Sequence, residues 1–203
     1  MKNVSLTGFI TQKLSLIICF PSRRADLFWS YICGMIPSIK EASPLELELI
    51  RALIQRIWKP TYREILSEEQ MDYMLEMMYN AGTLQEQMDA GHVFLILRED
   101  ETPVGFAGYE CNYHQEAGTC KLHKIYLLPE TQGKGFGKML LHAVVEQAKA
   151  AGQERLLLNV NRYNKALQFY RNYGFEVIAE EDIDIGQGYL MNDYVMALSL
   201  QEA

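Results

Sequence analysis

The feature that most constrains this chain is a glycine-rich turn between a predicted strand and a predicted helix. The stretch "LLPETQGKGFGKMLLHAVVEQ", residues 127–147, carries glycines at three alternate positions, which are Gly133, Gly135 and Gly137. Residues 121–128 are apolar and β-prone, and after the turn apolar residues recur at three- and four-residue steps as far as a helix-ending Gly152. A helix start presents unpaired N–H groups and the positive end of its dipole, and glycines let an anion approach closely. The turn therefore predicts a site that suits a pyrophosphate.

Two other phosphate-binding motifs do not fit this spacing. A Walker loop requires G-x-x-x-x-G-K-[ST], and a dinucleotide fingerprint requires G-x-G-x-x-G, whose sixth position is Lys138 in this chain. The alternative that remains is a glycine-rich turn that only joins a strand to a helix.

The rest of the chain alternates between predicted strands and helices. A helix over residues 43–58 is predicted by a serine cap followed by a proline, and a second helix over residues 67–80 opens with a capping-box-like S-x-x-Q. A further helix is predicted over residues 164–173. Strand-like segments lie at residues 36–42, 92–99, 103–114, 119–128, 155–160, 175–181 and 189–198. We expect an α/β domain with a mixed, mostly antiparallel sheet flanked by helices.

Two motifs resemble the signatures of the GCN5-related N-acetyltransferase (GNAT) family. "PETQGKGFG" is similar to the Q/R-x-x-G-x-G/A signature, and "NRYNKALQFYRNYGFE", residues 161–176, is similar to the second signature. The resemblance covers roughly residues 35–200 and implies a GNAT-like fold with acetyl-coenzyme A as co-substrate. The residues that it implies for coenzyme binding are Ile125, Tyr126, Leu127, Gln132, Gly133, Lys134, Gly135, Phe136, Gly137, Lys138, Asn161 and Asn164.

Acetyl transfer to an amine requires a base, because an alkyl amine with a pKa near ~10.4 leaves about one molecule in 2,500 neutral at pH 7. The resemblance places the base on the strand before the glycine turn, where relatives often carry a carboxylate and this chain has His123. Glu110 and a water chain are the other candidates. The resemblance also makes Tyr170 the acid that stabilises the departing thiolate. Packing roles for His123 and Tyr170 are the alternatives.

The acceptor is harder to predict than the donor. "RIWKPTYREILSEEQMDYML" and "LHKIYLLPETQGKGFGK" resemble bacterial polyamine (spermidine/spermine) acetyltransferases, which implies a small cationic amine as acceptor. Two interpretations, the lining of an acceptor groove and a solvated loop, are open for the carboxylates Glu110, Glu180, Glu181, Asp182 and Asp184. A protein amino group, and a non-catalytic acyl-coenzyme A-binding module, are the alternative readings. A homodimer is left open.

The charge distribution separates residues 1–34 from residues 35–203. The first segment has four basic residues against one acidic residue, a charge of +3, which leaves −10 on the remainder of a total of −7. The acidic remainder shows no basic stripe, which argues against a nucleic-acid partner and favours cationic ones. No apolar run reaches the ~18 residues of a membrane span, so no membrane partner is expected.

The domain and compartment predictions follow from the same segments. Residues 14–20 are at the short limit of a signal-peptide core and lack a cleavage site, so secretion is not expected. We interpret Met35 as the natural start of a domain over residues 35–203, preceded by an extension over residues 1–34 that is disordered or not native. The four cysteines form no C-x-x-C pair and no metal spacing with the four histidines. The sequence thus predicts reduced thiols, no metal and a cytoplasmic protein.

Overall fold

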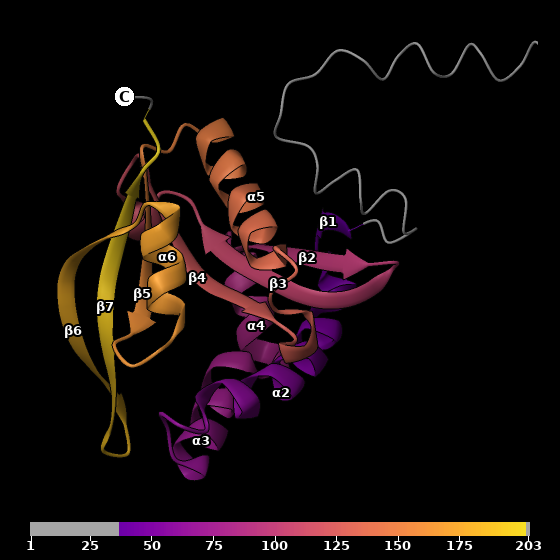
Figure 1. Ribbon diagram of the computed structural model, residues 1–203, viewed down its shortest axis with the longest axis vertical. Coiled ribbons are helices and arrows are strands. Elements are labelled where there is room, and N and C mark those ends of the chain that lie inside the picture. The colour runs from indigo at the N-terminus through magenta and orange to yellow at the C-terminus, as the bar shows by residue number, and fades with distance from the viewer. Residues whose placement is uncertain (1–36, 202–203) are drawn as a thin grey trace, which may run out of the picture. The chain divides into compact units, whose positions relative to one another are not determined.

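The computed structural model describes residues 37–201, which form a seven-stranded sheet and five α-helices (Figure 1). The predictions about residues 1–34 lie outside these described residues. Within residues 37–201, no helix has both the length and the apolar character that crossing a membrane requires.

The elements follow one another along the chain in the predicted alternation. The strands are β1 (Pro37–Glu41), β2 (Val93–Glu99), β3 (Thr102–Glu110), β4 (Thr119–Leu127), β5 (Arg155–Asn161), β6 (Glu176–Gly186) and β7 (Tyr189–Ser199). The α-helices are α2 (Leu47–Tyr62), α3 (Glu68–Tyr79), α4 (Ala81–Asp89), α5 (Phe136–Ala150) and α6 (Ala166–Tyr173). Short 3-10 turns are η1 (Pro44–Glu46), η2 (Tyr113–Gln115) and η3 (Pro129–Thr131).

The sheet is mixed and mostly antiparallel, as predicted. Its strand order is β1-β2-β3-β4-β5-β7-β6, and every neighbouring pair is antiparallel except β4 and β5. The parallel pairing of β4 with β5 ends at Leu122 and Leu158, although β4 continues to Leu127 and β5 to Asn161. The two strands therefore diverge toward their C-terminal ends (Figure 1).

The helices cover opposite faces of this sheet. On one face, the Tyr109 hydroxyl of β3 donates to the Gln147 side chain of α5. On the other face, Lys124 of β4 donates to the Gln87 side chain of α4, 2.8 Å away. Helix α6 lies beside α5, since a Cβ atom at Gly137 would be 3.7 Å from the Phe169 ring. The buried core lies between the sheet and these helices.

Two predicted boundaries are wrong. The first helix was predicted to end at residue 58, but α2 continues through Pro60 to Tyr62, because the Trp58 and Tyr62 rings pack together at 4.9 Å and hold the last turn. The proline removes the N–H that would bond the Arg56 carbonyl, and the Thr61 hydroxyl donates separately to the Ile57 carbonyl at 2.7 Å. The strand predicted over residues 103–114 ends at Glu110, since Asn112 has a φ of 54° that ends the extended backbone.

Candidate active site

The glycine turn forms a left-handed entry to α5. Gly133 and Gly135 have φ values of +81° and +82°, and Gly135 is the N-cap of a helix that begins at Phe136, as predicted. A Cβ atom at either glycine would have no other atom within 4 Å, so the backbone conformation requires glycine and crowding does not. The open space lies at the N-terminus of α5, where unpaired N–H groups attract an anion.

The side chains of this turn are either held by the protein or exposed to solvent. Lys134 lies 3.0 Å from the Glu99 carboxylate and 5.7 Å from the centre of the Phe136 ring. The backbone N–H of Gln132 donates to the Pro129 carbonyl at 3.2 Å, and the Gln132 and Lys138 side chains are exposed. An anion at the turn would therefore meet mainly backbone donors.

The end of β4 has one paired edge. Ile125, Tyr126 and Leu127 pair with residues of β3, and their register with β5 has already ended. In the described part of the chain this leaves their other edge without a strand partner. An extended ligand lying in the gap between β4 and β5 would find backbone donors and acceptors there.

A β-bulge places His123 at the head of this gap. Gly108 pairs with Lys124 and Tyr109 pairs with Leu122, so His123 is the extra residue of β4. Leu122 is also the last residue of β4 that pairs with β5. The bulge thus places His123 at the point where β4 and β5 separate.

His123 belongs to a cluster with His92 and Glu110. The Nε2 atoms of His123 and His92 lie 3.1 and 3.3 Å from the same carboxylate oxygen, Oε2 of Glu110. The two imidazole rings stack with centres 4.5 Å apart. Burial, with the neighbouring Lys124 charge, lowers the pKa of His92 to about 4. Burial, with the neighbouring histidine and lysines, lowers the pKa of His123 to about 3, so both imidazoles are neutral at pH 7.

Four tyrosines surround the gap from the helices and from β4. The Tyr126 hydroxyl lies 3.4 Å from that of Tyr62 and accepts from that of Tyr79 at 3.3 Å. Tyr170 of α6 is buried, and burial, with the neighbouring Tyr62, raises its pKa above the ordinary value. Its phenol is therefore protonated at neutral pH. Tyr62, on α2, links the predicted acid to the other tyrosines.

The two predicted asparagines take part in local hydrogen bonds. Asn161 Oδ1 accepts from the N–H of Tyr163 at 3.1 Å, and Asn164 Oδ1 accepts from the N–H of Ala166 at 2.8 Å, where α6 begins. Asn164 also hydrogen bonds with Tyr62, which connects this turn to the tyrosines. Both side chains thus shape the loop between β5 and α6.

Asp193 is a buried carboxylate that sequence reasoning missed. It is 4% exposed, lies opposite Asn161 on β5 and Glu181 on β6, and is electrostatically coupled to Tyr62. Burial, with the nearby Glu181 charge, raises its pKa to about 6 despite a hydrogen bond from Asn159. In the sequence, only the alternation of side-chain direction along β7 could have indicated that Asp193 points inward.

The carboxylates predicted for an acceptor groove divide into different environments. Arg162 forms ion pairs with Glu180, at 3.4 Å, and with Asp182. Asp184 accepts from the Gly186 N–H at 2.8 Å in the β6–β7 turn. Glu181 accepts from Asn159 at 3.1 Å and faces Asp193. Glu181 is therefore the member of the predicted β6 set that adjoins the gap, while Glu110 belongs to the histidine cluster.

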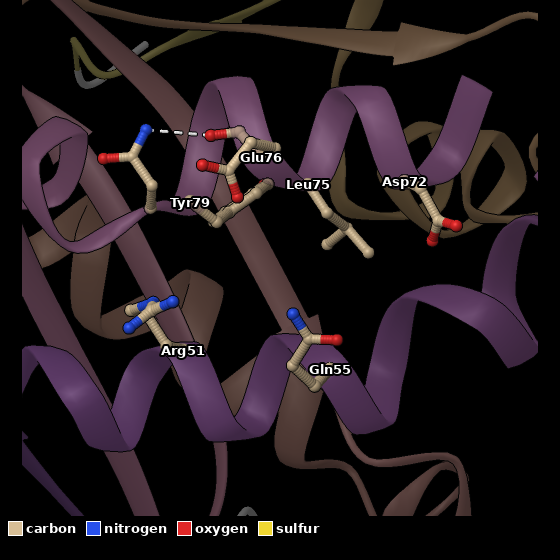
Figure 2. Close-up of a pocket in the computed structure, with 7 residues that line it drawn as sticks. Arg51, Gln55, Asp72, Leu75, Glu76 and Tyr79 are labelled. Atoms are coloured by element: carbon tan, nitrogen blue, oxygen red, sulfur yellow. Dashed lines mark hydrogen bonds between the residues drawn. The ribbon is translucent and has the colours of Figure 1, made fainter. Parts of the chain in front are cut away.

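A separate polar pocket of about 120 Å³ lies between α2 and α3 (Figure 2). Figure 2 shows Arg51 and Gln55 of α2 pointing toward α3, where Asn80 donates to the Glu76 carbonyl at 2.8 Å. None of the predicted site residues is among those that line it. We assign it no part in the candidate active site.

Comparison with known proteins identifies the family. Residues 51–175 match the model of the acetyltransferase (GNAT) family, which is more than half of the chain. The chain therefore belongs to the GNAT acetyltransferases, and the predicted fold is confirmed.

Individual relatives differ in their acceptors. Spermidine N(1)-acetyltransferase from Thermoplasma acidophilum is 30% identical over 159 residues, which are 75% of this chain and 94% of the relative. Ribosomal protein bS18-alanine N-acetyltransferase from Haemophilus influenzae is 30% identical over 138 residues, which are 68% of this chain and 87% of the relative. The chain spans only 38% and 53% of the length of two uncharacterized N-acetyltransferases that it also matches.

A solved structure supports the same family assignment. The PaiA N-acetyltransferase from Thermoplasma acidophilum, in complex with coenzyme A, is 28% identical and gives a TM-score of 0.69. The match covers 81% of this chain and 99% of that chain.

Proposed function

We propose that this chain transfers the acetyl group of acetyl-coenzyme A to a primary amine of a small cation, with a polyamine as the favoured acceptor. The observation that carries the proposal is the gap between β4 and β5. Strand β4 leads from the bulge at His123 directly into the glycine turn. A coenzyme lying along the unpaired edge of β4 would therefore extend from His123 to the glycine turn.

The glycine turn would hold the pyrophosphate of the coenzyme. Residues 133–138 offer backbone N–H groups at the start of α5, and the space beside Gly133 and Gly135 is open. The backbone of residues 125–127 would pair with the pantetheine arm. The coenzyme A complex of the Thermoplasma relative supports this donor.

Tyr170 would stabilise the departing thiolate. Its raised pKa keeps the phenol protonated, which is the form that can donate a hydrogen bond to the developing charge on sulfur. Because that charge develops only during the reaction, the hydrogen bond would lower the barrier more than it tightens donor binding.

His123 and Glu110 would together remove the proton from the amine. The lowered pKa of His123 makes its imidazole a weak acceptor alone, and the Glu110 carboxylate lies 3.1 Å behind it. We assign them as a relay in which His123 receives the proton and Glu110 takes it. The relay replaces the carboxylate that relatives often carry on this strand.

The acceptor cation would be held by carboxylates on the β7 side of the gap. Asp193 of β7 and Glu181 of β6 are paired on neighbouring strands, and Asp193 lies near Tyr62. A buried carboxylate beside a phenol ring attracts an alkylammonium group through charge and ring face, and the acceptor would share this carboxylate with the Lys121 and Arg162 cations. The spermidine acetyltransferase relative favours the same acceptor class.

An amine panel tests the proposal. Thiol release from acetyl-coenzyme A would be followed with spermidine, spermine, a neutral-chain monoamine and a peptide beginning with alanine. We expect the highest kcat/KM with the polyamines. A preference for the peptide would move the chain toward the protein-acetylating reading that the bS18 relative favours, and no release with any amine would favour a non-catalytic acyl-coenzyme A-binding module.

A further inference from the structure

His92, Glu110 and His123 converge from three neighbouring strands on one point. His92 directly precedes β2, Glu110 ends β3 and His123 is the bulged residue of β4. One ligand atom from each lies within 4.8 Å of the others. We propose that these three side chains bind a divalent transition-metal ion, with Zn²⁺ preferred, and that the metal-bound protein is inactive as an acetyltransferase.

The distances fit a tetrahedral ion. Zinc binds imidazole nitrogen and carboxylate oxygen at about 2.0–2.1 Å, so two ligand atoms of a tetrahedron lie about 3.3–3.4 Å apart. The two nitrogen-to-oxygen distances of this cluster are 3.1 and 3.3 Å. Two edges of the tetrahedron are thus close to this length before any ion binds, and the ligand nitrogens of the two imidazoles lie within 4.8 Å of each other.

The donor set selects the metal. Two imidazoles and one carboxylate suit zinc, whereas Mg²⁺ and Ca²⁺ take oxygen ligands. The cluster is therefore expected to discriminate against both of these ions.

The cluster is open enough to admit an ion. The side chains of His92, His123 and Glu110 are 13%, 22% and 25% exposed, so solvent reaches the cluster. Three protein ligands in a tetrahedron leave the fourth position for water. A bound ion would hold His123 and Glu110, the two groups of the proposed proton relay. The predicted inhibition rests on that proposed function, but the binding of zinc does not.

One atom limits the affinity. The Nδ1 atom of His92 is buried without a hydrogen-bond partner in the described structure. Tight zinc sites anchor the second nitrogen of each ligating histidine, and loss of such an anchor costs about 10–100-fold in affinity. We therefore expect zinc to bind about 10–100-fold more weakly than at a site with both histidines anchored, which suits reversible control better than a permanent structural site.

Zinc affinity would be measured on tag-free, chelator-treated protein by competition with a fluorescent zinc chelator. His92→Gln removes one ligand outside the proposed proton relay, and we expect it to weaken binding by more than about 100-fold, beyond the effect of second-shell changes. His142→Gln is the matched control, because His142 lies exposed on α5, away from the cluster. Cobalt spectra of the wild type, which show tetrahedral bands without a thiolate charge-transfer band, would exclude the cysteines as ligands.

The outcomes separate this proposal from the proposed function. We expect zinc to inhibit the wild type reversibly at its binding concentration, and His92→Gln, measured against its own zinc-free turnover, to require a higher zinc concentration for the same fractional inhibition. Equal zinc affinity of wild type and His92→Gln, or a thiolate band in the cobalt spectrum, would overturn the site. Zinc binding by a protein that acetylates no amine would leave the site standing and remove the proposed function alone.

Discussion

Replacing Asp193 with asparagine should stabilise the fold while weakening acceptor binding. The carboxylate is 4% exposed, and burial raises its pKa from 3.8 to about 6. At about 1.36 kcal/mol per pKa unit, the ionised group costs the folded state about 3 kcal/mol at neutral pH. Asparagine keeps the shape without the charge, so about 3 kcal/mol is the upper limit of the gain, or roughly 6–12 °C in Tm for a domain of this size.

The gain should depend on pH in one direction. The folded pKa lies above the unfolded one, so the stability contributed by the protonated carboxyl is full below pH 3.8 and is lost as pH rises through 6. The wild type and Asp193→Asn should therefore have similar free energies of unfolding near pH 4 and differ fully above pH 7. The charged and titratable groups that face Asp193 are Lys121, Arg162, Glu181 and Tyr62.

Urea unfolding of both proteins at pH 4, 6 and 7.5 measures the effect. The reasoning fails if Asp193→Asn is less stable than the wild type at pH 7.5, or if the difference in free energy is the same at all three pH values. Under the proposed function, KM for spermidine should also rise while KM for acetyl-coenzyme A is unchanged, which is the expected conflict between stability and a functional charge.

Four further substitutions test the donor site and the chemistry. Gly135→Val should weaken coenzyme A binding in a calorimetric titration, because valine strains a φ of +82° and fills the open space. Lys134→Ala should weaken coenzyme A binding less, and equal losses of affinity in the two variants would contradict the backbone assignment. Tyr170→Phe should lower kcat by roughly 10²–10⁴-fold in steady-state assays with little change in the KM for acetyl-coenzyme A, and undiminished kcat would remove the acid role. His123→Gln should lower kcat by a similar ~10²–10⁴-fold factor, while full turnover would exclude the proton relay.

The start of α5 was predictable because it depends on local chemistry. Positive φ at Gly135 and the apolar repeat from Phe136 onward are properties of adjacent residues, and both appear where the sequence indicates them. The end of α2 was not predictable, since the packing of Trp58 against Tyr62 overrides the local effect of Pro60.

The groups brought together from distant segments could not be read from spacing. His92 comes beside Glu110 through the pairing of β2 with β3, and His123 joins them at a bulge between β3 and β4 that no sequence spacing encodes. Asp193 likewise meets Glu181 and Asn161 through strand pairing. The sequence suggested His123 and Glu110 as separate candidates, and their contact through one oxygen atom is a result of the fold.

A crystal structure of the chain with coenzyme A would test the central claim most directly. The account predicts that the pyrophosphate contacts the backbone N–H groups of residues 133–138, that the pantetheine arm follows residues 125–127, and that the sulfur lies within hydrogen-bonding distance of the Tyr170 hydroxyl. A pyrophosphate bound away from the glycine turn, or a sulfur atom outside the gap between β4 and β5, would contradict it.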